Sequence, residues 1–263
     1  ELFGEAALPA DIEVIELFLQ TLKTSGVNQV HLDLGHVDIF RGLLAGSHLD
    51  SDSESQLFEL LQRKASAELS DWINLNISDK KLGGWLKALP GLAGSIEVLG
   101  AAKKALKGSP IAVMQAIDEL EQVVEAITKM GVSIHIDLGE MPGYHYHTGI
   151  VFAGYIQGYG KALGNGGRYD YVGEAFGRAR PATGFAFDLK SLVSQGQRPE
   201  SKVAGIFVPY TSDPECHHQV AVLRSQGNRV VQGFQAQIID LVELKCDRQL
   251  VNIDGKYLIQ NLS

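Results

Sequence analysis

Residues 142–192 read PGYHYHTGIVFAGYIQGYGKALGNGGRYDYVGEAFGRARPATGFAFDLKSL, and this stretch decides the fold. Segment 148–156 is rich in β-branched and aromatic residues, which predicts a buried strand followed by a short turn and a return strand. The glycine-rich run 164–167 and the Gly-Phe-Ala run 184–186 predict two further turns. Glycines without Cβ atoms let the backbone approach a neighbour closely and leave space beside it. A cation, a phenol and a carboxylate follow at 168–170, so the stretch predicts a ligand pocket.

Two other interpretations compete with this one. The glycines at 158, 160 and 164 superficially match a nucleotide-binding fingerprint, but their spacing differs and a strand follows them. That fingerprint needs a helix N-terminus under the phosphate, so we reject it. The alternating run 144–147 (YHYH) fits equally well an edge strand with one exposed face and one core face.

A helix–glycine–strand unit occurs twice in the chain. Apolar residues at helical spacing predict a helix over 10–25, closed by Gly26, and the alternation in 27–34 predicts a half-buried strand. Ser109-Pro110 begins a second helix that runs to about Met130, and the alternation recurs in 132–138. The two units predict two similar helix–strand pairs in one domain.

Candidate metal ligands are present, but they form no complete set. His31 and Asp33 share one strand face, as do His135 and Asp137, yet polar strand faces carry such residues anyway and the spacing fixes no third ligand. Residues 216–218 (CHH) are adjacent on a predicted helix and therefore point apart. We expect no metal site and no cofactor.

The region between the two units is predicted to be helical. A capping box at Ser53-x-x-Gln56 precedes one helix, and further helices are expected over 67–75 and 81–106. The last segment is expected to be broken up by its proline and glycines, at positions 83, 84, 90, 91 and 94. After a linker that begins at Gly196, a small α/β region follows. Its expected elements are strands at 203–208 and 229–232, helices at 214–225 and 235–244, and a hairpin over 250–259 around Asp254-Gly255.

The composition limits the classes of function that the chain can have. The chain has 263 residues, of which 45% are hydrophobic and 21% charged, as in ordinary globular proteins. Its formal net charge of −8 disfavours a nucleic-acid partner, since such partners need lysine and arginine to displace counterions. No apolar run is long enough for a membrane span. Cys216 and Cys246 are expected to be free thiols in a reducing cytosol, which predicts a cytoplasmic protein.

Three motifs and the chain's first residues together resemble a known family. The runs YHYHTGIVF, GGRYD and PATGFAFDL occur in this order, and ELFG opens the chain like the end of class II motif 2. They resemble the histidine-binding half of class II histidyl-tRNA synthetases, and more closely the paralogous family that serves as regulatory subunit of ATP phosphoribosyltransferase. The resemblance covers nearly the whole chain.

The resemblance implies an α+β fold. It predicts a six- to seven-stranded antiparallel sheet flanked by helices in a class II synthetase-like domain over 1–197, a helical insertion over about 44–129, and a small C-terminal α/β region over 198–263. The chain begins with Glu1 rather than methionine. We expect the N-terminal part of the synthetase-like domain, with its dimer interface, to be missing.

The resemblance also implies which chemistry is lost and which is kept. The two positions at which synthetases carry arginines for ATP chemistry are Pro142 and Ser191, so no adenylate formation and no catalytic residue are expected. Residues at positions that resemble histidine contacts are kept, although His147 replaces a tyrosine. The predicted ligand-binding residues are Glu1, Tyr146, His147, Gly166, Gly167 and Tyr169.

The function implied by the resemblance is regulatory. The chain is expected to activate a short-form ATP phosphoribosyltransferase catalytic subunit, which performs the first step of histidine biosynthesis, and to take part in histidine feedback. The expected assembly is a self-associated dimer within a hetero-octamer, with histidine as a possible ligand. The alternatives are a histidyl-tRNA synthetase fragment and a stand-alone histidine-binding paralogue. Acidic charge, missing arginines and the short C-terminal region disfavour the synthetase fragment.

Overall fold

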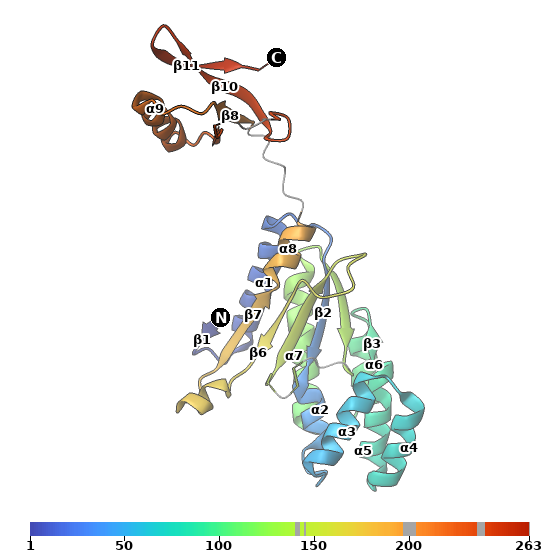
Figure 1. The fold of residues 1–263 in the computed structure, drawn as a ribbon. Helices are drawn as coiled ribbons and strands as arrows, with labels where there is room; N and C mark the ends of the chain where they lie inside the picture. Colours follow the sequence, from blue (N-terminus) through green and yellow to red (C-terminus); the bar gives the residue numbers. More distant parts are fainter. Residues whose placement is uncertain (140–142, 145, 197–203, 236–239, 263) are drawn as a thin grey trace. The chain divides into compact units, whose positions relative to one another are not determined.

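The computed structural model describes most of the chain, and the chain divides into two compact units, Glu1–Gln197 and Arg198–Ser263. Each unit has its own sheet and its own hydrophobic core (Figure 1). Each unit therefore buries its own apolar residues. The described residues are 1–139, 143–144, 146–196, 204–235 and 240–262.

The first unit contains a seven-stranded sheet with the order β1-β7-β6-β5-β2-β4-β3. All neighbouring strands run antiparallel except β2 and β4, which are parallel. The predicted class II synthetase-like α+β fold is confirmed, and the parallel pair has a simple cause. Each helix–glycine–strand unit contributes one strand, and both strands run in the same direction beside each other. The strands are Leu2–Phe3 (β1), His31–His36 (β2), Ala93–Gly94 (β3), Ser133–Asp137 (β4), Ile150–Tyr155 (β5), Gly164–Arg168 (β6) and Ala182–Phe187 (β7).

Helices α1 and α7 pack against each other and against the sheet. The apolar stripe of α1 buries Ile15, Phe18 and Leu22, and the Phe18 ring stacks on Phe187 at 4.8 Å between centroids. These two helices are the predicted ones at 10–25 and 110–130, and their glycines at 26 and 131 both have positive φ. The helices of this unit are Leu8–Thr24 (α1), Val37–Leu44 (α2), Ser51–Gln62 (α3), Ser66–Asn76 (α4), Lys80–Ala88 (α5), Val98–Ala105 (α6), Ile111–Thr128 (α7) and Leu189–Gln195 (α8), with 3₁₀ turns at Leu89–Gly91 and Val172–Phe176.

In the helical region between α2 and α7, one prediction agrees with the structure and one is wrong. The segment 81–106, which its proline and glycines were predicted to break up, divides into α5, a 3₁₀ turn, the short strand β3 and α6, since proline and glycines between 89 and 94 cannot continue a helix. The cap of α3 is Asp50 rather than Ser53, because its carboxylate accepts the Ser53 amide at 2.8 Å. The helix therefore begins two residues earlier than the predicted cap.

The glycine-rich run 164–167 is a strand and not the predicted turn. In β6, a Cβ on Gly166 would lie 2.3 Å from the Gly184 carbonyl oxygen and 2.6 Å from the Phe152 ring. A Cβ on Gly164 would lie 2.4 Å from the Phe187 ring. The run is glycine-rich because aromatic rings and backbone of the neighbouring strands occupy the space on either side. The run 184–186 likewise lies within β7 and forms no turn.

The second unit has a four-stranded sheet with the order β11-β10-β8-β9, and α9 packs its buried side chains into the same small core. The predicted helix 214–225 is confirmed, and so is the hairpin, whose turn residues Asp254 and Gly255 both have positive φ. The predicted helix 235–244 falls partly outside the described residues, and 241–245 form a turn. The elements are Gly205–Val208 (β8), Pro214–Ser225 (α9), Val230–Gln232 (β9), Cys246–Ile253 (β10) and Lys256–Asn261 (β11).

Within the part of the chain that the structure describes, no helix combines the length and the apolar character needed to cross a bilayer.

The packing of β6 gives a first prediction. Gly166→Ala should lower the free energy of unfolding by about 1–3 kcal/mol, since the new methyl group has to displace backbone and ring atoms. The matched control is Gly84→Ala in α5, where a Cβ meets nothing within 4 Å. That variant should be neutral or more stable by up to about 1 kcal/mol. Urea unfolding of both variants measures the difference, and equal stabilities would contradict this account of the glycine run.

Candidate ligand-binding site

One cavity brings together five of the six predicted ligand-binding residues. Its volume is about 200 Å³, below the roughly 300–1,000 Å³ of drug-sized sites, so it suits a ligand of amino-acid size. It is formed by the start of the chain, the segment before β5, and strands β6 and β7. The lining residues are Glu1, Tyr146, His147, Asn165, Gly166, Tyr169, Gly184, Phe185 and Ala186.

Glu1 and Tyr169 form the polar side of the cavity. The Tyr169 hydroxyl donates to Glu1 Oε1 at 2.9 Å. Burial, together with this hydrogen bond to a carboxylate, raises the pKa of Tyr169 well above its usual range. Burial and the charge of Glu1 also raise the pKa of Tyr146. Both phenols are therefore neutral at physiological pH, and Glu1 supplies the negative charge that a ligand ammonium group would meet.

Aromatic rings form the other walls. The Tyr146 and Tyr169 rings lie 5.0 Å apart between centroids at 31°, and Tyr146 meets the His147 ring edge-on at 5.1 Å. Half of the Tyr146 side chain is exposed, at 48%, so the wall it forms faces solvent on its other side. Flat rings around a small space are the surroundings that a planar side chain such as imidazole prefers.

Gly167 does not line the cavity, although it was predicted to bind ligand. A Cβ at this position would lie 2.8 Å from the His147 ring and 2.6 Å from the Ile150 carbonyl oxygen. Gly143 faces the other side of the same ring, because a Cβ there would lie 2.6 Å from His147 Nδ1. The two glycines therefore make room for the imidazole of His147.

Arg168 and Asp170 were predicted to stand beside the open space, and the structure corrects this. Arg168 is 6% exposed, and its guanidinium bonds both carboxylate oxygens of Asp11, at distances from 2.7 to 3.2 Å. Asp170 accepts from Arg168 at 3.1 Å and from the Ala182 amide at 3.1 Å. Both charged side chains hold the walls together and neither lines the cavity.

Arg41 of α2 is a contributor that the sequence did not reveal. Its Nη1 donates to the His147 carbonyl at 2.7 Å and its Nη2 to the Tyr144 carbonyl at 2.6 Å. The Tyr144 ring is stacked on Phe58 at 4.8 Å, and its hydroxyl donates to Glu54 of α3. The helical region thereby holds the segment that carries Tyr146 and His147. No local spacing signals a contact between residues more than 100 positions apart.

The remaining candidates lie elsewhere. Pro142 is outside the described residues. Ser191 lies on α8, where its hydroxyl is 2.6 Å from that of Tyr159, and it does not reach the cavity. Asp137 is paired with Lys64 at 2.5 Å. In the described ranges, no group of three histidine, cysteine or acidic side chains is placed to hold a metal ion.

The contacts of Arg41 give a second prediction. Arg41→Lys keeps the charge, but one ammonium cannot reproduce the planar fork between two carbonyls. Because hydrogen bonds to charged groups are worth about 1.5–3 kcal/mol, local opening around Tyr144 and His147 should increase about 10- to 100-fold. Hydrogen–deuterium exchange of this segment measures the opening. Arg63→Lys, in an exposed pair with Glu68, serves as the control. Unchanged exchange in Arg41→Lys would show that the fork is dispensable.

Comparison with known proteins assigns the family. The histidyl-tRNA synthetase family model matches residues 1–192, and the model for the ATP phosphoribosyltransferase subunit HisZ C-terminal domain matches 203–260. The chain is 44% identical over 265 residues to an ATP phosphoribosyltransferase regulatory subunit of Chromohalobacter salexigens, covering 100% of this chain and 67% of that protein. Across three such relatives the chain spans 65–67% of their length.

Solved structures agree with this assignment. A regulatory subunit/histidyl-tRNA synthetase from Bacillus halodurans C has a TM-score of 0.74 and 25% identity over 92% of this chain and 64% of its own. A chain of the ATP phosphoribosyltransferase (HisG:HisZ) complex from Thermotoga maritima shares the fold, with a TM-score of 0.55 and 18% identity over 70% of this chain and 62% of its own. The chain belongs to the family of ATP phosphoribosyltransferase regulatory subunits, which share the histidyl-tRNA synthetase fold.

Proposed function

We propose that this chain is the main part of a non-catalytic regulatory subunit that activates a short-form ATP phosphoribosyltransferase catalytic subunit in histidine biosynthesis. The observation that carries the proposal is the match of both units to models of this family. The related structure described as a HisG:HisZ complex supports a catalytic partner. A dimer of this subunit within a hetero-octamer, in the cytoplasm, belongs to the same proposal.

The cavity supports a binding role rather than adenylate chemistry. Among the residues that the structure describes, its lining contains no lysine or arginine. The resemblance also places Ser191 at a position where synthetases carry a cation. Stabilising charge on a transferring phosphorus needs such a cation, each preorganised group contributing about two to three decades in rate. The lining instead offers one carboxylate, two phenols and an imidazole. These groups suit an ammonium and a planar ring.

We therefore assign the cavity to histidine, as the feedback signal. The histidine ammonium would bond Glu1 and its imidazole would lie against Tyr146 and Tyr169. Because the Tyr169 hydroxyl already donates to Glu1, the carboxylate is held in place before the ligand arrives. Preorganisation of this kind reduces the entropy lost on binding. His147 adds a third ring beside the ligand and distinguishes this cavity from one lined by two adjacent tyrosines.

Activation follows from differential binding to two conformations of the catalytic partner. A subunit that adds no reacting group raises turnover only by binding the active conformation better than the inactive one. Each 1.4 kcal/mol of that difference shifts the equilibrium about tenfold. Histidine in the cavity would act by weakening this preference.

The third prediction tests activation. Saturating amounts of the complete regulatory subunit should raise the kcat of the isolated catalytic subunit, and the pair should co-purify. Histidine-dependent exchange of pyrophosphate with ATP should stay at background. A catalytic rate that does not change with added subunit would exclude the regulatory function, and ATP exchange would favour the synthetase alternative.

The fourth prediction tests the cavity. In the assembled complex, the variant with Glu1→Gln should bind histidine about 10- to 100-fold more weakly, since it loses a charge-assisted hydrogen bond worth about 1.5–3 kcal/mol. Tyr169→Phe should weaken binding less, because it only frees Glu1 from its partner. Glu13→Gln on the exposed side of α1 and the exposed Tyr210→Phe are the matched controls. Calorimetric titration gives the affinities. If Glu1→Gln and Tyr169→Phe bind histidine as tightly as the parent and the two controls do, the feedback site is not this cavity.

A further inference from the structure

An open groove lies between α6 and α7, in the helical region of the first unit. Its volume is about 620 Å³. Residues between 96 and 100 line one side, and residues between 121 and 129 line the other. It shares no lining residue with the cavity assigned to histidine. We call it the α6–α7 groove.

The two helices that form the groove lie antiparallel. Lys103, near the end of α6, bonds Asp118 and Glu121 of α7 at 2.7 and 2.6 Å. The start of α6 lines the groove together with the last turns of α7. From residue 121 to residue 129 the axis of α7 advances about 12 Å, at about 1.5 Å per residue. The groove therefore has room for about two turns of a helix laid along it.

The floor of the groove is apolar. Leu99 of α6 and Val124 of α7 are buried at its base, and Ile96 is 42% exposed at its edge. Gly100 leaves the middle open, because a Cβ there would meet nothing within 4 Å. Glycine is a poor helix former, and no contact in the described part of the chain requires it at this position. A second backbone can therefore approach the floor closely at Gly100.

The rim of the groove is acidic. Glu97 and Glu125 form no ion pair with another residue that the structure describes. The Ser95 hydroxyl donates to Glu97 and lowers the pKa of that carboxyl, so Glu97 is ionised at neutral pH. Glu121 is also on the rim, where it shares the ammonium group of Lys103 with a second carboxylate.

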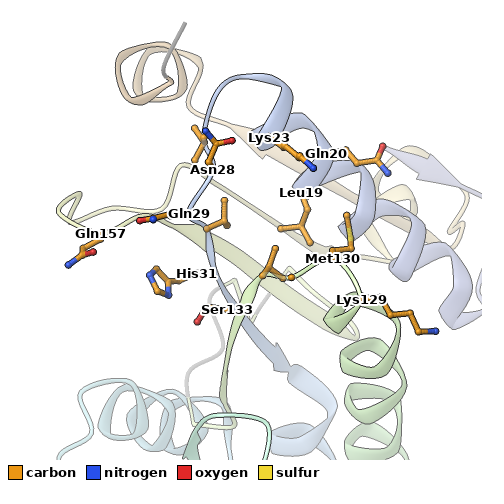
Figure 2. A pocket seen from close by; sticks show the side chains of 14 residues that line it. Leu19, Gln20, Lys23, Asn28, Gln29, His31, Lys129, Met130, Ser133 and Gln157 are labelled. Atoms are coloured by element: carbon orange, nitrogen blue, oxygen red, sulfur yellow. The ribbon is translucent and has the colours of Figure 1, made fainter. Parts of the chain in front are cut away.

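Among the described residues, Lys129 is the one cation of the lining, one turn after Glu125. It also borders a neighbouring cavity, but Figure 2 shows its side chain extending away from Leu19 and Met130, which lie in that cavity. With the ion pairs of Lys103 included, four carboxylates and two ammonium groups surround the groove, a formal charge of −2. Negative charge around an apolar floor favours a cationic partner.

Shape and charge decide the kind of occupant. A groove between two helices accepts the ridge of a third helix. A second copy of this chain would bring a net charge of −8 to an acidic rim, and a nucleic acid would bring phosphates, so both are disfavoured. Gly100, Glu125 and Thr128 are exposed along the outer side. A small molecule in the groove would therefore keep much of its surface in water.

Helix α7 also connects the groove to the cavity assigned to histidine. It packs against α2, and His36 at the start of α2 lies 3.0 Å from Glu119 of α7, between Nε2 and Oε2. Arg41 of α2 holds the His147 carbonyl at the wall of the cavity. A partner in the groove is thus one helix away from the segment that binds the feedback ligand. This position suits the catalytic subunit, whose activity that ligand would control.

We propose that the α6–α7 groove docks an amphipathic helix of the catalytic subunit, an inference that rests on the proposed function. Apolar side chains at three- and four-residue spacing on that helix lie over Leu99 and Val124. Lysine or arginine residues beside them bond Glu97 and Glu125. The backbone of the helix passes over Gly100, where the groove carries no side chain.

The test titrates the complete regulatory subunit against the catalytic subunit by calorimetry and by activation of the catalytic rate. Gly100→Leu fills the groove and should raise the Kd about 10- to 100-fold, as the loss of a central contact does at interfaces. Gly84→Leu in α5 is the matched control, since a Cβ there also meets nothing within 4 Å, and it should leave the Kd unchanged. Because leucine favours a helix more than glycine, both variants should unfold at the parent's temperature or above it.

Two further measurements test the chemistry of the occupant. Glu125→Lys reverses a rim charge and should weaken the complex about 3- to 10-fold, with a smaller effect at high salt. Glu13→Lys, exposed on α1 outside the groove, makes the same change of net charge and should have little effect. A photoreactive benzophenone residue in place of Thr128 should cross-link to a helix of the catalytic subunit that carries lysine or arginine beside apolar residues.

The other outcomes overturn the proposal. If the parent binds and activates the catalytic subunit, and Gly100→Leu and Glu125→Lys do so with the same Kd, the proposed function stands and the groove is not the docking site. Equal losses in Gly100→Leu and Gly84→Leu would show an effect of the helices and not of the groove. Cross-links to a second copy of the regulatory subunit would make the groove a self-interface. A parent that neither binds nor activates the catalytic subunit would contradict the proposed function itself, and this inference with it.

Discussion

The guanidinium of Arg168 is the contact on which the first unit depends. It lies 6% exposed between α1 and β6, forms a bidentate pair with Asp11, and also donates to the Glu5 carbonyl and to Asp170. A buried charge that loses its partner costs about 3–5 kcal/mol, so α1, the chain before it and the end of β6 can separate only at a high cost. Tyr169 follows Arg168 directly in the chain, and its hydroxyl donates to Glu1 Oε1 at 2.9 Å. The two polar residues of the ligand cavity therefore lie beside this network.

Arg41, the other arginine near the cavity, also has a structural role. Arg41 fixes two backbone carbonyls, and Arg168 fixes two carboxylates and a carbonyl. Both arginines support the walls of the cavity and neither lines it. In a site for phosphoryl chemistry, a cation has to be directed at the reacting group. Here the neighbouring arginines bind other parts of the protein instead. The cavity can therefore recognise an ammonium group and a planar ring, but it has no cation directed at a phosphoryl group, which fits a regulatory subunit.

Sequence patterns predicted those parts of the fold in which local physics decides the outcome. Helices α1 and α7 follow from local signals, the apolar spacing of α1 and the closing glycines at 26 and 131, and the β10–β11 hairpin follows from Asp254-Gly255. Five cavity residues were predicted from the resemblance. Apart from the cap of α3, the failures lie where packing against residues distant in the sequence decides the structure. The glycines of β6 suggested a turn, but they leave space for the rings of Phe152 and Phe187 on adjacent strands. The parallel pairing of β2 with β4 and the fork of Arg41 join segments about 100 residues apart and leave no local pattern.

Strand β5 runs from the cavity assigned to histidine to the opposite edge of the sheet. Tyr146 and His147 precede it at that cavity, and Gln157 follows it beside a second cavity of about 760 Å³, which residues before β2 and β4 also line. Its six residues span about 20 Å at about 3.4 Å per residue, and the ring of Phe152 is buried against Phe18 of α1. A fully paired, buried strand does not deform locally. A conformational change that histidine transmits from its cavity to the opposite edge of the sheet therefore has to move β5 together with α1, and linkage requires the partner bound to the changed conformation to alter the affinity for histidine by the same factor.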